Sequence, residues 1–185
     1  MSDKMVKLQD TTMRDGPQDD YPLTALQQGM LFHSLAAPQE GVYIQQLVCD
    51  LQEPLDVSAF VRAWRQLVKR HSVLRTSFSW ESSDTPFQIV HHAVKIPSEQ
   101  QDWRSWPAAE QEVQREAYLQ ADRQRGLNLA RPPLFRLALF RLDEAHYQLV
   151  WTSHHAILDG RSRWILLEEL FQLYEATRVG RAAML

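Results

Sequence analysis

The sequence contains a single cysteine, Cys49, among its 185 residues. One cysteine excludes a disulfide within the chain and any zinc site built on several thiolates, and it fits a reducing compartment. Cys49 stands in a run of strand-forming residues, where a thiol behaves as a small apolar side chain. We therefore interpret it as a packing residue rather than a nucleophile.

Long apolar runs are also missing, and so is an excess of charge of either sign. No stretch approaches the length that spans a bilayer, and no apolar segment follows the charged start as in a signal peptide. The formal net charge is -3 and the pI is about 6.2, with arginines scattered among acidic residues. These absences argue against nucleic acid or a membrane as a partner and predict a soluble cytoplasmic protein.

The sequence does contain enough apolar material for one folded domain. Hydrophobic residues make up 44% of the chain, and six of its residues are tryptophans. Residues 1–20 are polar and lack periodicity, which predicts a tail or linker, partly disordered. The folded unit is expected to span residues 21–185.

The first half of the folded unit predicts two helices around a strand. Thr24 and Gln27 have the form of a capping box, which predicts a helix through about Leu35. Residues 42–51 alternate in the manner of a strand. Asp56 has the form of an N-cap, and the apolar stripe after it predicts a helix that ends at residues 70–72.

The second half predicts strands and helices in irregular order. Strands are expected at residues 73–80, 87–92, 134–142 and 146–153, and the dense apolar content of the last two suits central positions in a sheet. A charged surface helix is expected from Pro107, at its first position, to Gly126, and a final helix over residues 162–177. The apolar stripe of the surface helix is thin, consisting of Val113, Ala117 and Ala121. This mixture predicts an α+β fold, a layered α/β sandwich with a mixed sheet flanked by helices.

The candidate chemistry lies where the last predicted strand ends, in the run His154-His155-Ala156-Ile157-Leu158-Asp159-Gly160. Neighbouring side chains in a strand point to opposite faces, so one histidine can enter a cleft while the other orients the loop. Asp159 lies within reach of a loop, and Gly160 allows a positive φ or a close backbone approach.

Three alternatives to a catalytic histidine have to be weighed. Two satisfied histidines near a core with a capping aspartate would have the same sequence. A metal site would have to draw on His91, His92 and His146, but the sequence has no His-Glu-x-x-His helix. Ser153 and Ser162 flank the run, yet neither stands in Gly-x-Ser-x-Gly, which argues against a serine nucleophile.

Three segments together resemble the condensation domains of nonribosomal peptide synthetases. Residues 154–160 match the family's His-His-x-x-x-Asp-Gly signature, and residues 70–78, Arg-His-Ser-Val-Leu-Arg-Thr-Ser-Phe, look like its Arg-His-x-x-Leu-Arg-Thr-x-Phe motif. Residues 21–33 are similar to its opening motif, although Ala25 stands where proline is usual. The three segments follow in the family's order and spacing.

The resemblance implies an acyltransferase of the chloramphenicol-acetyltransferase-like fold. Such domains join a peptidyl or aminoacyl thioester to the amine of a second amino acid, and both substrates arrive on the phosphopantetheine arms of carrier proteins. It implies no directly bound cofactor and no metal.

The resemblance also assigns roles to residues of this chain. His155 would face the acceptor amine, His154 would support the loop, and Gly160 would lie beside the reacting groups. Asp159 would form a structural ion pair with Arg75. Further support would come from two residues at the start of the second motif, Arg70 and His71.

The resemblance covers only the N-terminal lobe of such a domain, because no part of the chain is similar to the C-terminal lobe. We expect the chain to be inactive without that lobe or a neighbouring synthetase module. Two other hypotheses stay open: a non-catalytic docking module for a carrier protein, and a stand-alone acyltransferase with its site between subunits. The apolar surface that would meet the other lobe predicts a homo-oligomer.

Overall fold

The strands β6 (Phe135–Asp143) and β7 (His146–His154) form a central antiparallel hairpin. In the computed structural model, which describes residues 17–38, 40–81 and 85–181, they lie inside a four-stranded sheet of order β2-β7-β6-β5. β2 (Ile44–Leu51) pairs antiparallel with β7, and β5 (Ser98–Asp102) pairs parallel with β6. The predicted central positions of the two apolar strands are confirmed.

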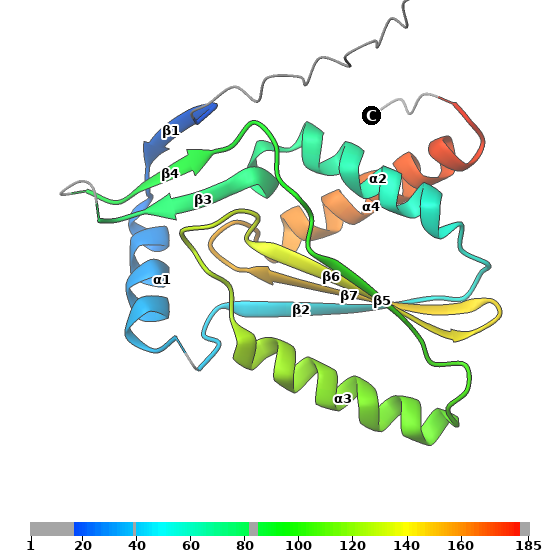
Figure 1. Cartoon of the computed structure of the whole chain (residues 1–185). Helices are drawn as coiled ribbons and strands as arrows, with labels where there is room; N and C mark the ends of the chain where they lie inside the picture. The colour runs from blue at the N-terminus through cyan, green and yellow to red at the C-terminus, as the bar shows by residue number, and fades with distance from the viewer. Residues whose placement is uncertain (1–16, 39, 82–84, 182–185) are drawn as a thin grey trace, which may run out of the picture.

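Successive side chains of the central hairpin point to opposite faces of the sheet and contribute to two apolar cores. Phe135, Leu137 and Leu139 of β6 face the larger core, whereas Ala138 and Phe140 face a smaller one. The larger core is covered by α2 (Val57–Arg70) and α4 (Gly160–Arg178), and the smaller by α3 (Ala108–Arg125). Figure 1 shows α3 on one face of the sheet and the other two helices on the opposite face. The predicted α+β layered sandwich is therefore confirmed.

The second sheet has three strands in the order β1-β4-β3. β3 (Thr76–Ser79) pairs antiparallel with β4 (Phe87–Val90), as predicted, and β1 (Asp19–Pro22) adds to the free edge of β4. α1 (Ala25–Ala36) follows β1 directly, and its buried Met30 and Leu31 belong to the larger core. This arrangement brings the N-terminal part of the described chain to the end of β7.

Predicted helix caps are present at two N-termini. The Thr24 side chain accepts from the backbone N–H of Gln27, and the Gln27 side chain accepts in return from that of Thr24. Asp56 accepts from the backbone N–H of Ala59 and begins α2. These local hydrogen bonds explain why both helices begin where the sequence indicates.

Four details of the predicted elements are wrong. Residues 72–75 form a short 3₁₀ helix, η1, so the strand predicted from residue 73 begins only at Thr76. Pro107 is the N-cap of α3 rather than its first residue. The thin stripe of α3 is exposed, and Tyr118, Leu119 and Asp122 face the sheet instead. Order begins before residue 21, since β1 includes Asp19 and Asp20; residues 1–16 of the predicted tail lie outside the described part.

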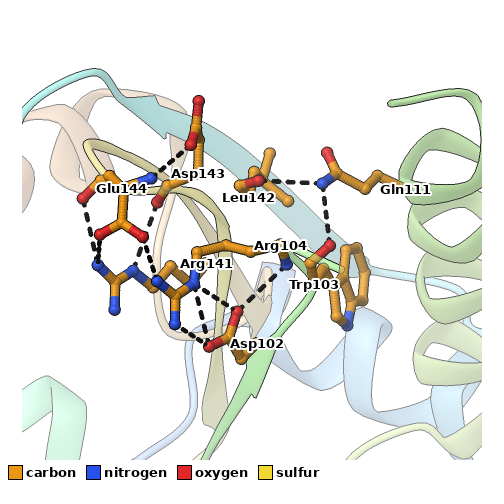
Figure 2. A network of polar contacts seen from close by, with 8 residues as sticks. All are labelled: Asp102, Trp103, Arg104, Gln111, Arg141, Leu142, Asp143 and Glu144. Atoms are coloured by element: carbon orange, nitrogen blue, oxygen red, sulfur yellow. Dashed lines mark hydrogen bonds and ion pairs between the residues drawn. The ribbon is translucent and has the colours of Figure 1, made fainter. Parts of the chain in front are cut away.

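A network of polar side chains lies at the end of the four-stranded sheet opposite His154. Arg104 donates to both carboxylate oxygens of Asp102, at 2.9 and 2.7 Å, and also contacts Glu144, to which Arg141 donates at 2.8 Å (Figure 2). The Arg104 guanidinium lowers the pKa of Asp102 to about 2. The amide of Gln111 donates to the carbonyl oxygens of Trp103 and Leu142, at 3.0 Å each. These contacts fasten the end of β5 and the start of α3 to the β6–β7 turn.

Candidate functional site

The loop between β7 and α4 is held down by its own apolar residues. Ala156, Ile157 and Leu158 are buried in the larger core, while His155 on their N-terminal side is half-buried. The backbone N–H of Ile157 donates to the carbonyl oxygen of His154 at 3.2 Å. A loop whose middle is anchored in a core presents its flanking polar residues in a fixed geometry.

His154 is buried, with 1% of its surface exposed, and it is neutral. The hydroxyl of Ser34 donates its hydrogen to the carbonyl oxygen of Met30 at 2.7 Å, so its oxygen accepts from Nε2–H of His154 at 3.0 Å. Nδ1 accepts from the backbone N–H of Ala156 at 3.2 Å. Burial, and secondarily the neighbouring His155, lowers the pKa of His154 to about 4. His154 therefore holds the loop as a neutral ring.

His155 has one ring nitrogen bonded to its own loop and a second that is not. Its Nδ1 lies 2.9 Å from the carbonyl oxygen of Leu158. A carbonyl oxygen only accepts, so Nδ1 carries the hydrogen and the lone pair of the neutral ring resides on Nε2. Nε2 makes no hydrogen bond within the described ranges of the chain. This is the orientation that a histidine needs to accept a proton or a hydrogen bond from a substrate.

Three residues that support the site were missed by the sequence analysis: Gln27, Ser34 and Tyr43. The Gln27 side chain caps α1 and also donates to the carbonyl oxygen of Ala156 at 3.0 Å, which joins the opening motif to the loop. The carbonyl oxygen of Tyr43 accepts from the backbone N–H of His155 at 2.8 Å. Gln27 and Ser34 fall inside or directly after the opening motif, so that motif was the signal that could have identified them.

The implied ion pair between Arg75 and Asp159 is absent from the described part of the molecule. Arg75 is buried, and its guanidinium donates to the carbonyl oxygens of Val68, His91 and His92 and to the side chain of Gln18. Its Nε and Nη1 thus donate to neutral acceptors in α2, in the segment after β4 and in the segment before β1. The prediction was wrong because it rested on resemblance, and the resemblance does not say where each side chain points.

Asp159 is exposed and acts as the N-cap of α4. Its carboxylate accepts from the backbone N–H of Ser162 at 2.7 Å, and its pKa is lowered by that hydrogen bond and by the Ser162 hydroxyl. Gly160 follows as the first helical residue, without a left-handed φ, and a Cβ built there would meet nothing within 4 Å. Among the residues that the structure describes, neither a positive φ nor a close approach requires glycine at this position.

Arg70 and His71 lie at the C-terminal end of α2 and contact α4. Nε2 of His71 lies 2.7 Å from Oε2 of Glu169, and Nε of Arg70 lies 3.2 Å from the same oxygen. The second motif therefore joins the two helices that cover the larger core. It does not bring either residue to His155 through any contact in the described segments.

A cation and a pocket flank the loop. Arg163, in the first turn of α4, is half-buried, and within the described segments its guanidinium contacts Gln45 of β2 but no carboxylate; burial lowers its pKa. A pocket of about 330 Å³ lies beside His154, between the end of α1, the turn before β2 and the segment after α3. Among the residues the structure describes, no three histidine, cysteine or acidic side chains are grouped as metal ligands.

Comparison with known proteins identifies the family of the chain. A family model described as "Condensation domain" matches residues 17–184. A linear gramicidin synthase protein of Brevibacillus parabrevis is 48% identical over 89% of this chain, and bacitracin synthase 3 of Bacillus licheniformis is 37% identical over 83%. The chain spans only 3% and 2% of those two proteins, respectively.

Solved condensation domains share the fold. The starter condensation domain of rhizomide synthetase RzmA superposes with a TM-score of 0.82 at 23% identity, over 90% of this chain and 41% of that one. The first condensation domain of the CDA synthetase gives a TM-score of 0.79 at 25% identity, over 92% and 42%. No described helix is long and apolar enough to cross a bilayer. With its motifs, layered fold and family match in agreement, the chain belongs to the condensation domain family of nonribosomal peptide synthetases.

Proposed function

We propose that residues 21–185 are the N-terminal lobe of a condensation domain. The complete domain forms an amide bond between two carrier-bound substrates. The observation that carries the proposal is the orientation of His155, whose Nδ1–H is held by Leu158 while Nε2 is free of the chain's described residues. A family match over residues 17–184 supports the assignment of this histidine to acyl transfer.

In the proposed reaction, the amine of the acceptor attacks the thioester carbonyl of the donor. A C–N bond forms, the C–S bond breaks, and the leaving thiolate takes up a proton as the nitrogen loses one. His155 Nε2 accepts a hydrogen bond from the amine and can receive its proton. The substrates are a peptidyl or aminoacyl thioester and an aminoacyl thioester, each on the phosphopantetheine arm of a carrier protein.

Positioning contributes more to this reaction than proton removal does. An α-amine has a pKa of roughly 7.7–8.0, so a sizeable fraction is already unprotonated near neutral pH. General base catalysis typically accelerates a reaction by roughly 10² to 10⁴, whereas alignment of two tethered reactants contributes about 7–11 kcal/mol. The fixed loop, with its buried middle and neutral His154, supplies such alignment on one side of the reacting groups.

An amide-formation assay with two loaded carrier proteins tests the proposal. We expect dipeptide product when the chain is joined to the C-terminal lobe of a condensation domain, and none from the chain alone. Absence of product from the joined form, despite carrier binding, would favour a non-catalytic docking module. Product from the chain alone would instead indicate a site completed between two copies of the chain.

A further inference from the structure

Tyr43 adopts a backbone conformation that an aromatic residue rarely takes. Its φ is +65°, which makes it the only non-glycine residue with a positive φ in the described part of the chain. It stands in the tight turn before β2, where Gly41 also has a positive φ, of +61°, and the N–H of Ile44 donates to Gly41 at 3.0 Å. A side chain of this size needs support to stay in that conformation.

This conformation occurs at the last backbone contact before the catalytic loop. The pairing of β2 with β7 ends where Ile44 meets His154. One residue further, the carbonyl oxygen of Tyr43 accepts from the N–H of His155 at 2.8 Å. The direction of that carbonyl depends on the backbone angles of Tyr43, so those angles determine where the His155 main chain is fixed.

The support comes from two histidine rings. The hydroxyl of Tyr43 lies 3.2 Å from Nδ1 of His33 in α1, and the two rings stack with centroids 6.3 Å apart and 18° between their planes. The ring of His154 is tilted by 57° to that of Tyr43, and the two ring centroids lie 6.2 Å apart. The Tyr43 ring therefore contacts both α1 and the end of β7.

We propose that Tyr43 is a positioning residue for His155. The left-handed backbone aims the Tyr43 carbonyl at the His155 N–H, and His33 and His154 hold the ring that keeps this backbone in place. Together with the Leu158 carbonyl on Nδ1, this fixes both the main chain and the ring of His155. The inference rests on the proposed function for its catalytic consequence, but the geometry can be tested without activity.

A matched pair of substitutions, Tyr43→Asn and Tyr43→Val, tests the role of the backbone. Both remove the ring, but asparagine enters the left-handed region readily whereas β-branched valine does so rarely. We measure amide hydrogen exchange of His155 and the ¹⁵N shifts of its ring in the 185-residue chain. We expect exchange about tenfold faster in Tyr43→Val than in Tyr43→Asn, with a smaller fraction of the Nδ1–H tautomer.

Equal exchange rates and equal tautomer fractions in the two variants would overturn the inference. If Tyr43→Val does not fold, Tyr43→Ala and Tyr43→Gly replace the pair, because they differ by one methyl group and only glycine enters the left-handed region without strain. Tyr43→Phe removes only the hydroxyl contact with His33. We expect its His155 exchange rate to lie between those of the parent chain and Tyr43→Val.

Activity separates this inference from the proposed function. In a chain joined to a C-terminal lobe, we expect Tyr43→Val to lower kcat about tenfold relative to Tyr43→Asn while KM for both carriers stays the same. If the exchange rate and ring shifts of His155 change while kcat does not, Tyr43 positions His155, but His155 takes no part in the reaction. An unchanged His155 signal would refute the role of Tyr43 whatever the activity.

Discussion

His154 and His155 are neighbours in sequence, but their rings meet different surroundings. His154 points inward, where Ser34 and the Ala156 N–H occupy both nitrogens. His155 is half-buried, and its Nδ1 is hydrogen-bonded to the carbonyl oxygen of Leu158. Since neighbouring side chains along a strand face opposite ways, a pair of histidines can provide one ring that supports the loop and, in the proposed function, one that meets the substrate.

Replacing His155 tests its reactive role. We expect His155→Ala, in a chain joined to a C-terminal lobe, to lower kcat yet leave measurable turnover with some substrate pairs, because positioning by the loop remains. Turnover is measured with several pairs of loaded carriers. Complete loss with every pair, in a variant that melts at the parent temperature, would indicate an obligatory base instead.

The pKa of His154 predicts a pH dependence of stability. Its value of about 4 lies below that of an unfolded histidine, near 6.5, so the unfolded chain binds the proton first as the pH falls. Stability therefore declines from pH 6.5 toward pH 4, by about 3 kcal/mol from this residue. The check is unfolding by denaturant over this range, compared with His154→Gln. A parent curve no steeper than that of the variant would contradict the prediction.

At the scale of elements, the start of α4 depends on Asp159. We expect Asp159→Ala to lower the melting temperature by a few degrees, because the N–H of Ser162 loses its acceptor. Asp159→Asn should retain most of the stability, since asparagine caps as well as aspartate. Thermal melting of both variants measures the effect. Equal losses in the two variants would show that charge, rather than capping, is what matters here.

α3 is attached to the sheet through the buried Asp122. Burial raises the pKa of this carboxyl, but hydrogen bonds from Arg136, Thr152, Arg125 and Gln46 outweigh that effect and lower it to about 2. The stabilisation is complete above about pH 4, the value of an unfolded aspartate, and is lost as the pH falls toward 2.

Removing this carboxylate leaves the Arg136 charge buried without its partner. We expect Asp122→Ala to lower the free energy of unfolding by about 3–5 kcal/mol, measured by denaturant titration at neutral pH. Glu116→Ala, which removes an exposed carboxylate from its surface pair with Arg115 in the same helix, is the control and should change little. Similar losses of unfolding free energy in the two variants would show that the buried Asp122–Arg136 pair has no special role in stability.

Periodicity located the elements with an apolar face and missed those without one. β5 is the sequence Ser-Glu-Gln-Gln-Asp, whose strand character comes only from backbone pairing with β6. β1 likewise has no buried residue. In α3, the face toward the sheet is determined by Asp122 and Tyr118, and a scan for apolar residues selects Val113 on the exposed side.

Motifs indicated a candidate loop, but they did not predict which distant segments contact it. The histidine run identified the loop, whereas Gln27 and Tyr43 reach it by long-range hydrogen bonds that no local pattern encodes. Arg75 shows the opposite error, because a motif implied a partner that the fold does not supply. Side-chain direction is decided by the available acceptors, and a single sequence does not display them.

At the scale of the whole molecule, large apolar side chains remain at the surface near the site. Leu26 and Phe32 of α1 and Trp164 of α4 are 70%, 69% and 64% exposed, respectively. We expect the 185-residue chain to self-associate in concentrated solution, and Phe32→Ser or Trp164→Ser to weaken the association. Sedimentation velocity measures it, with Trp106→Ser as the control. A monomeric parent chain at high concentration would rule the expectation out.

The β2–β7 pairing also has a consequence for biosynthesis. Ile44 pairs with His154, so β2 leaves the ribosome long before the strand that covers its edge. At a translation rate of about 5–20 residues per second, that edge stays unpaired for roughly 5–20 s before β7 is made. An unpaired edge is a place where nascent chains associate wrongly. Synonymous codon changes that slow translation between β2 and β7 should therefore reduce the yield of native protein more than the same changes placed before β2.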